Sequence, residues 1–138
     1  MKSIFLFWLA AALVLPASTP PANAIEGQWL NPQKDARFLI YKKQDRYFGK
    51  VVWGTGVRLD VKNPNPALRK RDLQSFDLLQ NFRYDDGSWV DGTIYDPREG
   101  KTYSCVLRLK SATQLDVRGY VGIPLFGRSE IWTKTTNP

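Results

Sequence analysis

The sequence predicts an all-β fold, an antiparallel barrel of about eight strands with one short helical turn in the connection over residues 54–74. Short runs in which apolar and polar residues alternate recur along the chain after its first 24 residues. Clusters of Gly, Pro, Asn and Asp interrupt these runs about every ten residues, and no segment has the sustained 3.6-residue apolar period of a long helix. A barrel of this size has an interior that side chains just fill or that holds one small ligand, and the alternation leaves both open.

Residues 1–24 have the features of a signal peptide. Lys2 supplies a positive start, and the apolar stretch from Ile4 to Leu15 is shorter than the roughly 20 residues that a membrane-spanning helix needs. Ala22-Asn23-Ala24 has the small-x-small form of a cleavage site. We therefore expect cleavage near Ala24 and an exported protein, periplasmic or secreted, with no transmembrane segment in its mature form. Residues 25–138 would then form a single barrel domain.

The first half of that domain contains a predicted hairpin and a long connection. Residues 36–42 and 46–53 are the two strands of the hairpin, and in the second strand the residues that share one face are Tyr47, Gly49, Val51 and Trp53. The connection over residues 54–74 contains Asn63-Pro64-Asn65-Pro66, which favours extended backbone, and residues 67–72 are long enough for one helical turn. Connections of this length in a compact domain are usually functional or cover another part of the fold.

The second half predicts the remaining strands more clearly. They cover residues 75–82, 89–95, 101–109, 114–120 and 128–134. Asp96-Pro97-Arg98-Glu99-Gly100 has the residue order of a turn, and Gly122 to Gly127 bracket an apolar loop. In residues 101–109 the apolar face is predicted to carry Tyr103, Cys105, Leu107 and Leu109, and in residues 114–120 Leu115, Val117 and Gly119.

Composition restricts the chemistry. The chain contains no histidine and a single cysteine, Cys105, so the usual zinc and copper sites and internal disulfides are excluded. Ser104 and Cys105 have no histidine base, and Cys105 lies in an apolar register, as a buried, inert thiol does. The acidic turns lack the ligand spacing of a calcium loop. We predict no catalytic residue, no metal site and no cofactor, and Asp91, Asp96 and Glu99 remain the carboxylates on which an alternative glycan-active enzyme would depend.

The charge balance favours anionic partners. The 20 Lys and Arg residues exceed the 13 Asp and Glu residues, a net charge of +7. Predicted partners are a small amphiphilic or anionic ligand, or an anionic component of the cell envelope such as a lipid headgroup. Export argues against nucleic acid, and the basic surplus is equally consistent with solubility alone.

Segments spread over residues 63–132 resemble a family of uncharacterised exported bacterial proteins, the domain of unknown function 2147. The matching segments include Asn63-Pro64 with Leu68-Arg69, Ile94-Tyr95-Asp96-Pro97, Gly100-Lys101-Thr102-Tyr103, Val117-Arg118-Gly119-Tyr120, and Gly127-Arg128 with Trp132; the opening Gly27-Gln28-Trp29 matches as well. The resemblance implies a lipocalin-like barrel with a pocket. It also implies that a basic residue of the last strand, here Lys134, covers Trp29, although the family more often has Arg at that position.

The expected function is that of a lipocalin-like barrel that binds a small molecule or lipid. Arg118 or Arg128 would hold its charge and aromatic residues would pack on the rest. The alternative is a filled barrel that acts as an envelope interaction module through its exterior. The candidate ligand-binding residues are Trp29, Trp89, Tyr95, Tyr103, Arg118, Tyr120, Arg128 and Trp132.

Overall fold

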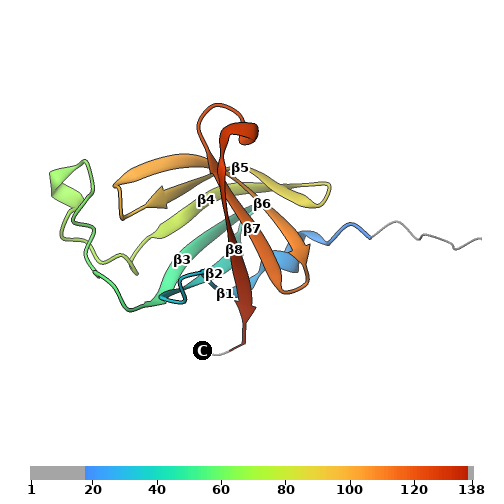
Figure 1. The fold of residues 1–138 in the computed structure, drawn as a ribbon, viewed down its shortest axis with the longest axis horizontal. Coiled ribbons are helices and arrows are strands. Elements are labelled where there is room, and N and C mark those ends of the chain that lie inside the picture. Colours follow the sequence, from blue (N-terminus) through green and yellow to red (C-terminus); the bar gives the residue numbers. More distant parts are fainter. Residues whose placement is uncertain (1–17, 137–138) are drawn as a thin grey trace, which may run out of the picture.

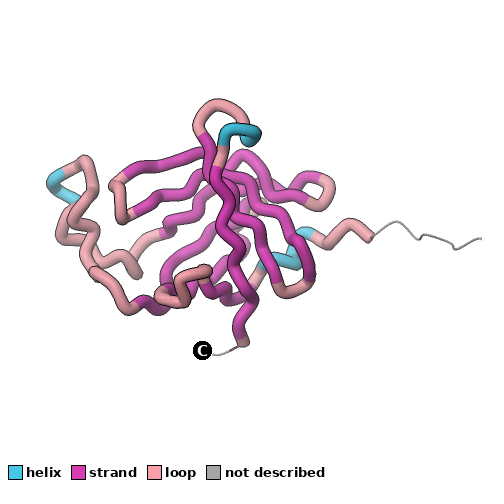
Figure 2. Tube along the Cα trace, viewed as in Figure 1, coloured by secondary structure: helices cyan, strands magenta, loops and turns pink. Residues whose placement is uncertain are grey.

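The computed structural model describes residues 18–136, which form a closed barrel of eight antiparallel strands (Figure 1). Each strand pairs with the next in sequence, and the first pairs with the last, so the sheet has no free edge. The only helical segments among these residues are three short 3-10 turns, coloured cyan in Figure 2. The elements are η1 (Ala22–Ile25), β1 (Gly27–Leu30), β2 (Ala36–Lys43), β3 (Arg46–Gly54), η2 (Pro66–Leu68), β4 (Asp77–Asp85), β5 (Ser88–Asp96), β6 (Lys101–Ser111), β7 (Gln114–Tyr120), η3 (Pro124–Phe126) and β8 (Arg128–Thr135).

The predicted fold class is confirmed, and so is the inward face of most strands. In β7, Leu115 and Val117 are buried and the residues between them are more exposed, as the alternation predicts. Strand bounds shift by a few residues, most at β4, which begins at Asp77 and continues through Tyr84 and Asp85 to the turn. The helical turn in the long connection is present as η2, one residue earlier than expected.

β4 and β5 each contain one irregularity. In each strand, two inward side chains are therefore separated by three positions in the sequence, whereas simple alternation would separate them by two. Asn81 and Asp91 adopt the left-handed conformation, with φ of 62° and 61°. The β5–β6 register shifts between Trp89 and Gly92. Because each irregularity inserts an extra residue, Leu79 and Phe82 both turn into the barrel, as do Trp89 and Gly92.

The up-and-down order places alternate connections at opposite ends of the barrel. The β1–β2, β3–β4, β5–β6 and β7–β8 connections share one end, which we call the open end. The long β3–β4 connection lies at the left of Figure 1 and the β7–β8 loop at the top. The β2–β3, β4–β5 and β6–β7 turns share the other end, the closed end.

The segment before β1 seals the closed end. The Trp89 indole Nε1 donates to the carbonyl of Ala22 at 3.0 Å, and the Trp29 indole Nε1 donates to the carbonyl of Ile25 at 2.8 Å. The Tyr84 hydroxyl donates to the carbonyl of Pro20. Of the expected leader, residues 1–17 lie outside the described residues, whereas residues 18–24 are described and form part of this seal. Over residues 18–136, no helix has the length and apolar character needed to cross a membrane.

The closed half of the barrel is filled by side chains. Its fully buried residues include Trp29, Phe82, Trp89, Leu107 and Leu115. Two inward glycines make room for this packing: a Cβ atom on Gly92 would lie 2.4 Å from a Phe82 ring carbon, and one on Gly49 would lie 2.7 Å from a Leu79 methyl. Small and large residues thus interdigitate here, and any cavity must lie toward the open end.

Candidate functional site

A cavity of about 990 Å³ occupies the open half of the barrel and opens between the connections of that end. The volume is at the upper end of the range found for small-molecule sites, roughly 300–1,000 Å³. The sequence left open whether the barrel is hollow or filled, and the structure combines a filled closed half with a hollow open half. The cavity wall contains residues from all eight strands or their connections.

The floor of the cavity is apolar. Trp132 of β8 forms its base, and its ring stacks on Phe38 of β2 with centroids 4.1 Å apart and an angle of 12° between the planes. Both rings are buried and cannot turn without displacing each other. The other apolar residues of the wall include Val51, Leu78, Leu79, Ile94 and Val117. This surface suits a hydrocarbon or ring-bearing part of a ligand.

One side of the wall carries a cation that two carboxylates of the protein already pair. Arg98, in the β5–β6 turn, makes two contacts with Asp96, at 3.2 and 3.3 Å, and a third with Glu130 of β8 at 3.6 Å. The other carboxylate oxygen of Glu130 accepts from the Trp132 indole at 3.1 Å. The hydrogen bonds to Asp96, together with the charges of Asp96 and Glu130, raise the pKa of Arg98 against the effect of burial. Arg98 is thus satisfied by the protein itself.

Arg128 differs from Arg98. It lies two residues before Glu130 and four before Trp132 on β8, so its side chain shares their inward face at the open end. Within residues 18–136, no hydrogen bond or ion pair joins the Arg128 side chain to another residue. Tyr103 lies on the same part of the wall: its hydroxyl donates to Glu99 at 2.6 Å, which raises the pKa of Tyr103, and the Arg128 charge acts in the opposite direction. Arg128 therefore presents a free guanidinium at the cavity mouth.

The strand neighbour of Arg128 leaves space beside it. Gly119 of β7 is the Cα partner of Arg128 and lines the cavity. A Cβ atom on Gly119 would meet only ordinary contacts, the nearest being a methyl of Ile94 at 3.6 Å. Unlike Gly92 and Gly49, Gly119 is therefore not required by close packing, and its missing side chain contributes to the cavity.

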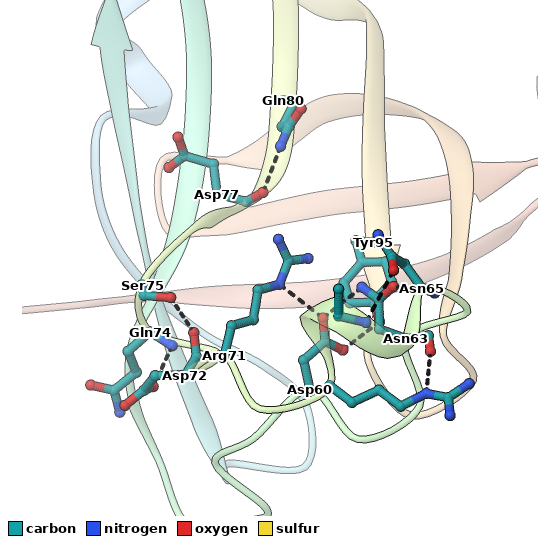
Figure 3. Close-up of polar contacts among 12 residues, drawn as sticks. Asp60, Asn63, Asn65, Arg71, Asp72, Gln74, Ser75, Asp77, Gln80 and Tyr95 are labelled. Carbon is teal, nitrogen blue, oxygen red and sulfur yellow. Dashed lines mark hydrogen bonds and ion pairs between the residues drawn. The ribbon is translucent and has the colours of Figure 1, made fainter.

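The β3–β4 connection (residues 55–76) covers one side of the mouth and is fastened by a buried carboxylate. Asp60 is fully buried and accepts from the Tyr95 hydroxyl at 2.5 Å, from Asn63 Nδ2 at 2.8 Å and from Arg71 Nε at 3.0 Å (Figure 3). Burial alone would raise the pKa of Asp60, but these hydrogen bonds and the Arg71 charge hold it below its usual value. We call Asp60 and its three donors, Asn63, Arg71 and Tyr95, the Asp60 clasp. Because Tyr95 belongs to β5 and also lines the cavity, the clasp ties the connection to the barrel wall.

The structure brings five of the eight predicted binding residues to the cavity. These are Tyr95, Tyr103, Tyr120, Arg128 and Trp132. Trp29 and Trp89 lie instead in the filled closed half, where both are fully buried. Arg118 faces outward and binds the β7–β8 loop, donating to the carbonyl of Pro124 at 2.7 Å and to the Ser129 hydroxyl at 2.9 Å.

The candidate nucleophile and carboxylates that the sequence singled out are buried or bound by other side chains of the protein. Burial raises the pKa of the Cys105 thiol, which is fully enclosed by the barrel. Asp91 lies on the outer face and pairs with Arg83 at 2.9 Å. Asp96 and Glu99 do line the cavity, but Arg98 holds the first and the Tyr103 hydroxyl binds the second.

Sequence reasoning missed Glu130, Gly119 and Arg98 as parts of the wall. For the first two a signal existed, because Glu130 shares its phase with Trp132 and Gly119 with Val117. For Arg98 there was none, since its approach to Glu130 depends on how the barrel closes. The apolar rim of the β3–β4 connection was also missed, with Val57, Leu59 and Val61 on the cavity wall.

Comparison with known proteins agrees with this architecture. A solved structure of HP1028 from Helicobacter pylori, described as a member of the lipocalin family, superimposes with a TM-score of 0.73 at 18% sequence identity, over 81% of this chain and 83% of that one. This likeness concerns the fold. A search among curated proteins finds no match. A family model described as an uncharacterized protein conserved in bacteria, DUF2147, matches residues 27–134, and the chain therefore belongs to the DUF2147 family.

Proposed function

We propose that this protein is an exported binding protein that holds a small amphiphile with an anionic group in the open half of its barrel. The observation that carries the proposal is the combination of an apolar cavity floor with the unpaired guanidinium of Arg128 on the inward face of β8 at the mouth. The hydrocarbon part of the ligand would lie on Phe38, Val117 and Trp132, and its carboxylate or phosphate would reach Arg128.

The part of the mouth beside Arg128 favours an anion over a cation or a neutral polar group. Arg98 already has two carboxylate partners, so a third anion gains little there. Arg128 has none among the described residues, and a guanidinium forms paired hydrogen bonds with planar or tetrahedral anions. A ligand without an acid group would leave that guanidinium to solvent and lose the charged hydrogen bonds.

Displacement of a dansyl-labelled undecanoic acid, followed by fluorescence, tests the proposal. We expect the unmodified protein to bind the acid more tightly than the corresponding alcohol. Arg128→Gln should lower the affinity for the acid at least about tenfold and leave the affinity for the alcohol nearly unchanged, because a hydrogen bond to a charged group is lost. Arg83→Gln is the matched control, since Arg83 lies on the outer face of the barrel.

A second variant tests the cavity independently of charge. Gly119→Val adds a β-branched side chain to the space beside Arg128, and it should lower the affinity for both the acid and the alcohol. Ser104→Val, on the outer face of neighbouring β6, is its control. The proposed function would be refuted if the unmodified protein bound neither probe. It would also be refuted if Arg128→Gln and Arg83→Gln lost equal affinity for the acid.

Export is tested separately from binding. The expectation from the N-terminal sequence is a protein that leaves the cytoplasm and loses its leader during export. Fractionation of cells that express the full chain, with intact-mass measurement of the recovered protein, should place it in the periplasm or medium. Recovery of the uncleaved chain from the cytoplasm alone would contradict this part.

A further inference from the structure

We propose that the open end of the barrel docks onto an anionic lipid surface, with the mouth of the cavity facing the membrane. The first observation is the distribution of exposed apolar side chains. All large hydrophobic residues that residues 18–136 expose lie at this end: Trp53, Val57, Leu59, Val61, Val121, Ile123, Leu125 and Phe126. Apolar exposure gathered on one end of a small protein marks an interaction surface.

The exposed residues form two tips on the rim of the cavity. One tip belongs to the β3–β4 connection and contains Val57, Leu59 and Val61. The other is the β7–β8 loop (residues 121–127), where Leu125 and Phe126 are 75% and 76% exposed. Val57 and Phe126 also line the cavity, so the tips and the mouth form one continuous surface. In Figure 1 the two connections lie at the left and at the top of the view.

Both tips are held in place by hydrogen bonds. Arg118 donates to the carbonyls of Pro124 and Leu125 in the β7–β8 loop, at 2.7 and 3.4 Å. The Asp60 clasp holds the β3–β4 connection (Figure 3). The apolar side chains are thus presented outward by a fixed backbone, and insertion would require little ordering of the loops.

The charge of the same end complements an anionic surface. The β3–β4 connection carries Arg58, Lys62, Arg69, Lys70 and Arg71 against Asp60 and Asp72. Both carboxylates are taken by arginines, Asp60 by Arg71 and Asp72 by Arg58. Lys62, Arg69 and Lys70 therefore stay without a carboxylate partner within the described chain. The turns of the closed end mix both signs, with Asp45, Asp85 and Asp86 against Lys43, Arg46 and Lys110.

Apolar tips flanked by unpaired basic residues fit a lipid surface better than a protein. Lipid accepts two separate apolar tips at any spacing, whereas a protein partner would need two matched pockets around an open cavity. Phosphate headgroups supply the anions for Lys62, Arg69 and Lys70 at the depth of the interface. Docking does not require an occupied cavity, so the inference stands apart from the proposed function. Where both hold, an amphiphile would pass between membrane and barrel without crossing water.

Sedimentation of the mature protein with vesicles tests this inference. We expect binding to vesicles of phosphatidylglycerol and phosphatidylethanolamine, a clear decrease with added salt, and much weaker binding to phosphatidylcholine alone. Lys62→Glu with Lys70→Glu should lower the partition coefficient at least about fivefold, because each basic residue near an anionic surface contributes attraction. Lys42→Glu with Lys110→Glu, away from the open end, should have little effect.

A second variant tests the apolar tip. Leu125→Ser with Phe126→Ser should lower partitioning at least about tenfold, and it should fold normally because both side chains are exposed. Gly119→Val should bind vesicles as the unmodified protein does, which separates docking from ligand binding. The inference is overturned if vesicles do not retain the protein at low salt, or if the closed-end charge variant loses as much binding as the open-end one. Specific retention by a protein partner with no vesicle binding would overturn it as well.

Discussion

Lys134 covers Trp29 at the closed end of the barrel, with its Nζ atom 5.4 Å from the centroid of the indole ring. The two residues are Cα partners in the β1–β8 pairing that closes the sheet. Gly27, two residues before Trp29, has a φ of 126°, and a Cβ atom there would contact the Lys134 side chain at 3.6 Å. Gly27, Trp29 and Lys134 thus pack together where the first and last strands pair and close the barrel.

Replacement of Lys134 should report the contribution of this contact to stability. Lys134→Met keeps the aliphatic stem and removes the charge, and we expect the free energy of unfolding to fall by about 0.5–1 kcal/mol. Lys134→Arg should retain or increase stability, because a guanidinium can stack on the indole. Urea denaturation measures both, with Lys110→Met as the control for the loss of one positive charge at the closed end. If all three variants were equally stable, the cation over Trp29 would contribute nothing.

Removal of the N-terminal segment should destabilise the barrel. A chain that starts at Ile25 lacks the Ala22 carbonyl, so the indole N–H of the fully buried Trp89 loses its acceptor. We expect a loss of about 1–3 kcal/mol relative to a chain that starts at Ser18, measured by urea denaturation. A chain that starts at Pro21 keeps that carbonyl and loses only the Pro20 acceptor of Tyr84, so it should lie between the two. Equal stability of all three would contradict the prediction.

Alanine at two inward glycines should have opposite consequences. Gly92→Ala places a methyl group 2.4 Å from the Phe82 ring in the filled half, and we expect a loss of roughly 1–3 kcal/mol or more from overpacking. Gly119→Ala meets only ordinary contacts and should be neutral or stabilising by up to about 1 kcal/mol. Thermal and urea unfolding measure both. Phe82→Leu should partly rescue Gly92→Ala, and failure of that rescue would point to backbone strain at Gly92.

The strand pattern could be predicted because side-chain alternation is local. The inward phase of Leu115 and Val117 follows from period two alone. The irregularities at Asn81 and Asp91 could not be predicted, because a left-handed residue inside a strand depends on what the neighbouring strand packs against. The role of Ala22 was also hidden, since the small residues that suit a cleavage site, Ala22 and Ala24, also pack against the barrel core.

The sequence could predict which face of a strand each site residue occupies, but not how far along the barrel axis it lies. Alternation indicates that Trp29, Trp89 and Trp132 all point inward, yet only Trp132 lies beside the cavity. Position along the barrel axis depends on strand stagger, which the sequence does not reveal. Arg118 and Arg128 differ in face, which alternation does indicate. Arg118 lies in the phase opposite Val117 and binds a loop, whereas Arg128 shares the phase of Trp132 and lines the cavity.

Tyr95 should control the order of the β3–β4 connection. Tyr95→Phe removes the hydroxyl that donates to buried Asp60, and we expect a loss of about 1–3 kcal/mol because the carboxylate keeps fewer donors. Hydrogen exchange should quicken at the Asp60 and Leu73 amides, which bond to the Arg71 and Arg58 carbonyls. Tyr103→Phe is the control, since its partner Glu99 is exposed. Unchanged exchange in Tyr95→Phe would show that the remaining donors suffice.

The same clasp should depend on pH at both extremes. The pKa of Asp60 is lower in the folded protein than its ordinary value of 3.8, so its contribution is complete above about pH 4 and is lost as the pH falls below that value. Burial and the hydrogen bond to Asp60 raise the pKa of Tyr95 from 10 to about 12, so its contribution is present below pH 10 and lost between pH 10 and 12. Urea denaturation across both ranges, compared with Asp60→Asn and Tyr95→Phe, isolates each term. Each variant should flatten the pH dependence in its own range, and a dependence identical to that of the unmodified protein would assign the titration to other groups.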